Sequence, residues 1–137
     1  MLNLFNFPRI DSHLKSSLIL DGRKYEIELF KIKFSQPIDS KQQPQSEMRG
    51  GQMMITLTQT VPDLIYNWAM KPNIQKNGSV VFSIETGSAP LKIEFTNAKC
   101  IQINRSVNAS GGLRTNLIIS PEIIMMNGIE HNNFWIE

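Results

Sequence analysis

The sequence contains few of the residues on which catalytic and metal-binding sites most often depend. Its 137 residues include one cysteine, Cys100, and two histidines, His13 and His131. A single cysteine excludes a disulfide bond within the chain and any zinc site that needs several thiolates. The formal net charge is only +2, and no run of lysine and arginine forms a phosphate-binding stripe. Nucleic acid is therefore not an expected partner.

Long apolar runs are missing as well. No stretch approaches the ~20 consecutive apolar residues that an α-helix needs to cross a bilayer. The first eight residues lack a basic region and hold only a broken apolar stretch, which argues against a conventional signal peptide. We expect the protein to fold in the cytoplasm without membrane insertion, and any export to use a route that needs no signal peptide.

No group of residues predicts a catalytic or cofactor site. Asp11, Ser12 and His13 are the residue types of a hydrolytic triad, but consecutive residues cannot converge on one substrate atom. A hydrolase built on these residues would be tested by His13→Ala. Glu130 beside His131 could supply metal ligands, yet no second histidine or cysteine lies at a useful spacing. We expect no enzymatic activity, no cofactor and no metal.

The pattern predicts one α-helix, at about residues 62–70. Thr60 could cap it, Pro62 suits its first turn, and Asp63 places an acid there. Pro72 ends it, because proline keeps the preceding residue out of helical geometry. We expect one face to serve the core or a subunit contact. That face carries Leu64, Ile65, Trp68 and Ala69.

The remaining apolar segments alternate as strands do and are separated by turn residues. Asp21-Gly22 and Asn127-Gly128 are typical two-residue turns, and residues 104–112 are expected to form a polar loop. The fold class predicted is mainly β (α+β): a small antiparallel β-barrel of two packed sheets with one α-helix. The expected strands cover residues 17–20, 25–34, 52–59, 79–85, 91–96, 113–120 and 123–126.

One strand changes the face that carries its apolar side chains. The apolar positions are Tyr25, Ile27 and Leu29, followed by Phe30, Ile32 and Phe34. A strand changes its buried face only through a bulge or by meeting a second apolar surface, such as a neighbouring subunit. Both explanations remain open from the pattern alone.

Three segments lie outside this regular pattern. Residues 1–16 form an N-terminal extension, either flexible or packed on a neighbour, that precedes a single barrel domain at 17–137. A polar extended loop at about 36–49 is longer than a turn requires, so it is expected to be functional or disordered. Phe134 and Trp135 are expected to dock on the barrel or on a neighbouring molecule.

From about Leu18 to Trp135, this order of segments resembles the type VI secretion tube protein family, Hcp (TssD), in the form found in Bacteroidetes. The matching features are the long loop ending in Arg49-Gly50-Gly51, a threonine-rich strand, an acid-led helix with Trp68, the strand NGSVVF, the segment KIEFTNA and the tail IIMMNGIEHNNFW. The match therefore depends on the order of segments and on short motifs, none of which is catalytic.

The resemblance implies a structural subunit that forms hexameric rings, which stack into the inner tube of a contractile injection apparatus. Effectors would pass through or bind in the lumen, and the protein would be secreted through the apparatus. The implied partners are other copies of the chain, the sheath, spike and baseplate proteins, and secreted effectors. The implied ring-stacking loop includes Pro37, Asp39, Lys41, Pro44 and Arg49. Two alternatives remain, a monomeric β-barrel binding or adaptor module and a phage-like tail tube protein.

Overall fold

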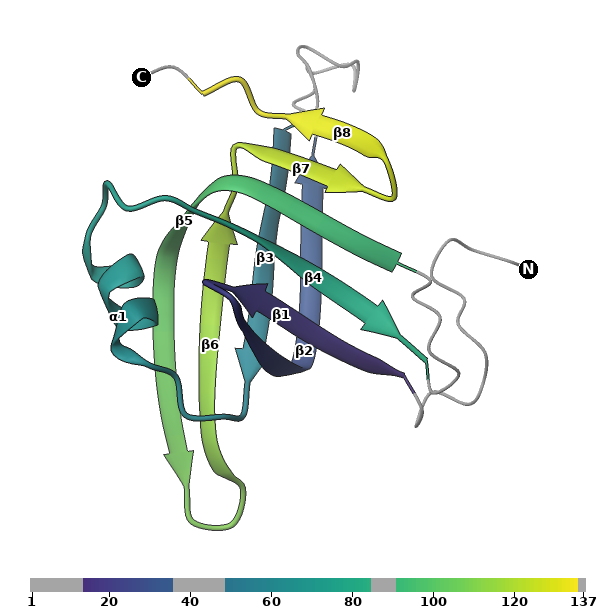
Figure 1. Cartoon of the computed structure of the whole chain (residues 1–137). Coiled ribbons are helices and arrows are strands. Elements are labelled where there is room, and N and C mark those ends of the chain that lie inside the picture. Colours follow the sequence, from purple (N-terminus) through teal and green to yellow (C-terminus); the bar gives the residue numbers. More distant parts are fainter. Residues whose placement is uncertain (1–13, 36–48, 85–90, 136–137) are drawn as a thin grey trace, which may run out of the picture.

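A computed structural model of the chain describes residues 14–35, 49–84 and 91–135. These residues form eight strands and one helix (Figure 1). The elements are β1 (Lys15–Leu20), β2 (Arg23–Ser35), β3 (Arg49–Leu57), α1 (Asp63–Met70), β4 (Lys76–Ser83), β5 (Leu91–Asn108), β6 (Gly112–Ser120), β7 (Ile123–Met126) and β8 (Ile129–Asn132). Most of the predicted N-terminal extension and most of the predicted loop at 36–49 lie outside the described residues.

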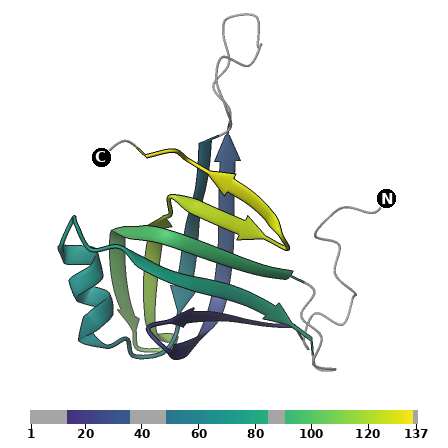
Figure 2. The ribbon, with the colours of Figure 1, turned by 45° about the horizontal axis from the view of Figure 1, so that its top comes forward.

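The strands close into a barrel. Their order is β4-β1-β2-β3-β6-β5-β7-β8, and an additional β4–β5 pairing joins the ring β4-β1-β2-β3-β6-β5. Every pairing is antiparallel. In Figures 1 and 2 the long strand β5 curves from one sheet into the other, and α1 lies beside it. The predicted fold class, a mainly β antiparallel barrel of two sheets with one helix, is confirmed.

A bulge in β2 explains the change of its apolar face. The register between β2 and β3 shifts between Ile27 and Leu29, so Glu28 is the extra residue. Before the bulge Ile27 is buried, whereas Leu29 after it is 44% exposed. Phe30 and the alternate residues that follow then pack against the core. Of the two explanations that the pattern left open, the bulge is present in the structure.

The barrel core is built from alternate residues of the strands and from one face of α1. On β3, Met53, Ile55 and Leu57 are fully buried, as the strict alternation predicts. Ile65 and Trp68 of α1 close one side of this core. The largest fully buried side chains are Trp68, Phe95, Leu18, Leu20, Met53, Ile55, Leu57, Ile65, Ile93, Leu117, Ile119 and Ile124.

The helix has the predicted extent but a different start. Pro62, not Thr60, is the residue before its first turn, and no side chain caps the helix. Asp63 still places a negative charge near the exposed backbone amides of that turn. Leu64, expected on the face that serves the core or a subunit contact, is 48% exposed. Four residues on, Trp68 fills the space against the barrel, which leaves Leu64 at the edge of the buried face.

The predicted polar loop at 104–112 is wrong. β5 continues to Asn108 and pairs with β6 from Gly112 onward, so that a hairpin extends beyond the barrel, as the lower end of Figure 1 shows. Its side chains lack an apolar alternation because both faces of this extension are largely solvated. Val107, near the tip, is 80% exposed.

Thr115 of β6 carries a buried hydroxyl without a hydrogen-bond partner in the described structure. Such a hydroxyl costs free energy, because water solvates it in the unfolded chain and nothing replaces that water on folding. Thr115→Val keeps the shape and removes the oxygen. We expect it to raise the free energy of unfolding by about 1 kcal/mol, measured by urea denaturation. Thr115→Ser, which keeps the hydroxyl, is the control; a destabilised valine variant would contradict this account.

Candidate assembly surfaces

The described residues show no candidate metal centre. No group of three or more histidine, cysteine, aspartate and glutamate residues among them could hold a metal ion. Cys100 is buried, as expected of a structural thiol. Its burial raises the pKa of the thiol to about 11, partly offset by a backbone hydrogen bond with Gln102, so the thiol form dominates near neutral pH. The triad candidates Asp11, Ser12 and His13 lie outside the described residues.

Among the described segments, no helix is long and apolar enough to cross a membrane.

The helix is anchored to β5 from two sides. Trp68 Nε1 donates a 2.9 Å hydrogen bond to the Ala98 carbonyl in the buried interior. On the surface, Arg105 donates a 2.6 Å hydrogen bond to the Tyr66 hydroxyl, and its guanidinium lies 5.7 Å from the centre of the same ring. These contacts fix α1 relative to both the barrel wall and the base of the β5–β6 hairpin.

The outer side of this fixed helix exposes two large apolar side chains as well as Asp63 and Asn67. Leu64 is 48% exposed and Met70 is 69% exposed. Large exposed apolar side chains held on a rigid element suit burial against another protein surface. We refer to Leu64 and Met70 as the helix patch.

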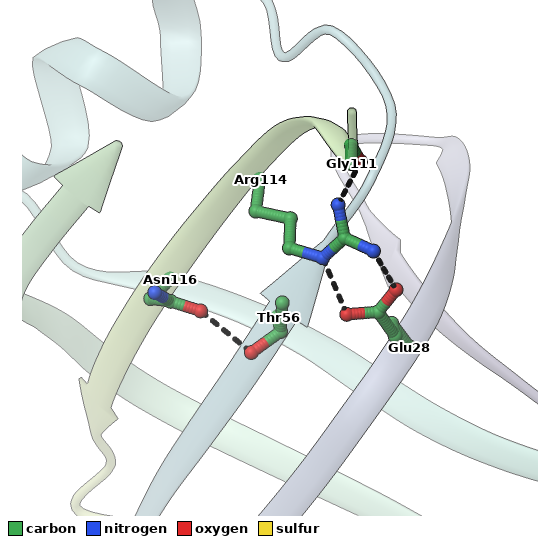
Figure 3. Close-up of polar contacts among 5 residues, drawn as sticks. All are labelled: Glu28, Thr56, Gly111, Arg114 and Asn116. Carbon is green, nitrogen blue, oxygen red and sulfur yellow. Dashed lines mark hydrogen bonds and ion pairs between the residues drawn. The ribbon is translucent and has the colours of Figure 1, made fainter. Parts of the chain in front are cut away.

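A polar group links three strands on the outer face of the barrel wall (Figure 3). Glu28, the extra residue of the β2 bulge, reaches across β3 and accepts two hydrogen bonds from Arg114 of β6, at 2.8 and 2.9 Å. Arg114 also donates to the Gly111 carbonyl at the hairpin turn. Next to it, Thr56 donates a 2.6 Å hydrogen bond to Asn116. The group therefore ties the bulge to the start of the projecting hairpin.

The C-terminal segment binds the first residues of β3. The Asn133 side chain, which is buried, donates to the carbonyls of Gly50 at 2.8 Å and Pro121 at 3.0 Å. Its Oδ1 accepts a 3.1 Å hydrogen bond from the Gly50 amide. Gly50 has a φ of +127°, and a Cβ there would lie 2.6 Å from the Lys33 carbonyl oxygen, so only glycine fits. We call this set of bonds the C-terminal clip.

The same segment also contacts the end of β2. The His131 ring packs edge-to-face against Phe34, with the ring centres 5.1 Å apart. Figure 2 shows β8 and the following residues lying beside the ends of β2 and β3. Both strands that flank residues 36–48 are therefore held by the C-terminal segment, β2 through Phe34 and β3 through Gly50.

The two C-terminal aromatic residues have different surroundings. Trp135 is partly buried, and the Lys99 ammonium lies 5.1 Å from the centre of its ring, within the range of a cation–π contact. Phe134 has a positive φ and is 60% exposed. Docking of this residue on a neighbour therefore stays a prediction.

The candidate site residues predicted from the sequence lie in different parts of the structure. Ile65 and Trp68 lie in the core and Leu64 lies in the helix patch. Arg49 begins β3. Pro37, Asp39, Lys41 and Pro44 lie outside the described residues, so their role in stacking stays a prediction.

Sequence reasoning missed the roles of Asn133, Glu28 and Arg114. A change of apolar face marked the bulge that contains Glu28, but nothing in the sequence pairs it with Arg114, 86 residues away. Asn133 lies in an ordinary polar stretch near the C-terminus. No local pattern distinguishes it from Asn132 beside it.

The described residues form a closed six-stranded antiparallel barrel with one anchored helix and several exposed apolar side chains, which places the chain in the class of small β-barrel proteins. The chain belongs to the family of the hemolysin coregulated protein Hcp (TssD), whose family model matches residues 12–136. By family it is a tube protein of type VI secretion, which is a structural family and not a family of enzymes.

Solved structures share this fold. Hcp1 from Flavobacterium johnsoniae is 24% identical, with a TM-score of 0.79 over 87% of this chain and 99% of that chain. Hcp1 from Salmonella typhimurium is 11% identical, with a TM-score of 0.71 over 87% of this chain and 91% of that one. A chain of the anti-feeding prophage baseplate is 10% identical, with a TM-score of 0.52 over 90% of this chain and 98% of that one. No curated protein matches the sequence.

Proposed function

We propose that the protein forms hexameric rings that stack into the inner tube of a type VI secretion apparatus, and that effectors bind in or pass through the lumen. The observation that carries this proposal is the family match across residues 12–136. In this function the partners are other copies of the chain, the sheath, spike and baseplate proteins, and secreted effectors. The protein is made in the cytoplasm and exported through the apparatus.

The distribution of exposed apolar residues supports assembly through more than one surface. A ring of identical subunits needs two different, complementary surfaces on each subunit, because each contact is head-to-tail. The helix patch lies beside β5, whereas Val107 is near the tip of the hairpin and Ile129 is on β8. We assign the helix patch and the strands next to it to contacts within a ring. Ring-to-ring contacts belong to the loop of Pro37, Asp39, Lys41, Pro44 and Arg49.

Negative-stain electron microscopy of the purified protein tests this function. Rings with an open centre, singly or in stacks, are expected. Uniform monomers at high concentration would instead support the alternative of a monomeric binding or adaptor module. The similarity to a prophage baseplate chain leaves a phage-like tail tube protein as an alternative. Rings are expected of a type VI tube and of a phage-like tube, so electron microscopy does not distinguish between the two. Genes for the secretion apparatus beside the gene of this protein would favour the type VI tube.

The helix patch gives a sharper test. Changing both Leu64 and Met70 to glutamate places two charges on the proposed contact, where burial without partners is costly. Both side chains are solvent-exposed in the subunit, so we expect stable monomers with an almost unchanged melting temperature. Thr58→Glu, which adds a charge at an exposed position before the helix, should leave rings intact. Rings in the double variant would remove the helix from the ring contact.

A further inference from the structure

An apolar groove lies between β2 and the strands that cross it. It has a volume of about 450 Å³, and Lys31 is the one charged residue that lines it among the described residues. Its apolar lining comes from four strands: Phe30 and Ile32 of β2, Phe82 of β4, Leu91 and Ile93 of β5, and Met126 of β7. This lining is continuous with the barrel core, because Ile93 is fully buried and the Phe30 ring packs edge-to-face on Phe82 at 5.3 Å.

The groove exists because β1 leaves β2 at the bulge. β1 pairs with β2 only as far as Glu26, and along its whole length it pairs with β4. After the bulge, residues 29–35 of β2 pair with β3 alone among the described strands. The apolar residues on this part of β2 therefore turn inward but meet no strand beside them, and Phe30 and Ile32 are only partly buried.

The chain enters the described structure at the edge of this groove. Ser16 is the register partner of Phe82, and its Oγ donates a 3.2 Å hydrogen bond to the Ile27 carbonyl, next to the bulge. Leu14, the first described residue, packs against the core. Whatever precedes Leu14 therefore starts beside Phe82 and the second half of β2, where the groove lies.

The residues before Leu14 have the composition that the groove would accept. Five of the first seven residues are large and apolar, namely Met1, Leu2, Leu4, Phe5 and Phe7. The Hcp family model begins at residue 12, so the family match does not account for them. From Leu14 back to Phe7, seven residues of extended chain span about 23 Å, which is ample for a groove of this size.

We propose that residues 2–7 dock in this groove of their own chain, with Phe5 and Phe7 as the apolar anchors. Docking within the chain is favoured over docking on a second copy because a short tether gives an effective concentration of about millimolar. The segment covers the partly buried ring of Phe30 and completes the barrel wall where β1 leaves it. The N-terminal residues then act as a built-in cover of an apolar surface.

Cysteine cross-linking tests this contact directly. In a Cys100→Ser background, Phe7→Cys is combined with Ile32→Cys in the groove, and the pair is oxidised. We expect a disulfide within one chain, seen as faster migration on a non-reducing gel. The matched control combines Phe7→Cys with Val107→Cys, which lies on the projecting hairpin and should not cross-link. A covalent dimer with Ile32→Cys would overturn the proposal in favour of docking on a second copy, and no disulfide would overturn it outright.

A second measurement needs no engineered cysteine. Phe5→Ser with Phe7→Ser should uncover the groove and raise the fluorescence of the apolar probe ANS several-fold. Asn3→Ser with Asn6→Ser alters the same segment without removing an apolar anchor, so its ANS fluorescence should match that of the wild type. Equal fluorescence in all three proteins would contradict the proposal. Neither experiment depends on ring formation, so the proposed tube function and this contact can fail separately.

Discussion

Trp68→Ala is expected to lower the free energy of unfolding by about 3–5 kcal/mol, because it empties the largest fully buried position of the fold. The lost ring belongs to one of the two buried side chains, Ile65 and Trp68, through which α1 packs on the core. The change also removes the hydrogen bond to the Ala98 carbonyl, which would be left in an apolar interior. Since the helix carries Leu64 and Met70, loosening it should also weaken the proposed rings.

The measurement is urea denaturation of the variant together with its oligomer size. Trp68→Phe separates the two causes, because phenylalanine fills most of the space but donates no hydrogen bond. A loss of only about 1–2 kcal/mol is expected for that variant, from the unpaired carbonyl and a small cavity. Unchanged melting and unchanged oligomer size in Trp68→Ala would show that this side chain holds neither the barrel nor the assembly.

Asn133→Ala is expected to lower the free energy of unfolding by about 2–3 kcal/mol, because it removes the hydrogen bonds of one buried amide at once. The Gly50 amide and the carbonyls of Gly50 and Pro121 all lose the side chain that they bond. The two bonds to Gly50 are only partly buried, so water can replace part of what the Asn133 side chain provides. The expected loss of stability is therefore smaller than the cost of leaving three fully buried groups unpaired.

Asn132→Ala is the matched control for the C-terminal clip. Its side chain accepts one local hydrogen bond, from the backbone amide of Phe134. We expect it to lose less than about 1 kcal/mol. Hydrogen exchange provides the local measurement: the Gly50 amide should exchange much faster in Asn133→Ala and at the wild-type rate in Asn132→Ala. Slow exchange in both variants would mean that another group protects this amide.

The clip has a consequence for the proposed assembly. The C-terminal segment holds β3 through Gly50 and β2 through the contact of His131 with Phe34. These two strands flank residues 36–48, which the proposed function places between rings. A weakened clip would leave ring formation through the helix patch intact while changing how rings stack. Electron microscopy of Asn133→Ala would distinguish single rings from stacks.

The sequence by itself determined the class of fold and most of its elements. Alternation on β3 placed Met53, Ile55 and Leu57 in the core, and Asp21-Gly22 predicted the first hairpin. The change of apolar face in β2 indicated either a bulge or a second apolar surface, and Pro72 marked the end of the helix. These predictions succeeded because each depends on residues within a few positions of one another, where periodicity and turn geometry act directly.

Only the tertiary structure decided how distant segments meet. Closure of the barrel through β4 and β5, the bond from Asn133 to Gly50 and the pair Glu28–Arg114 join residues far apart in sequence. The extension of β5 to Asn108 was missed because a solvated hairpin needs no apolar alternation. The groove beside β2 was missed as well, since it arises where β1 leaves its neighbour. Such features depend on the path of the whole chain in space, which no local pattern of side chains encodes.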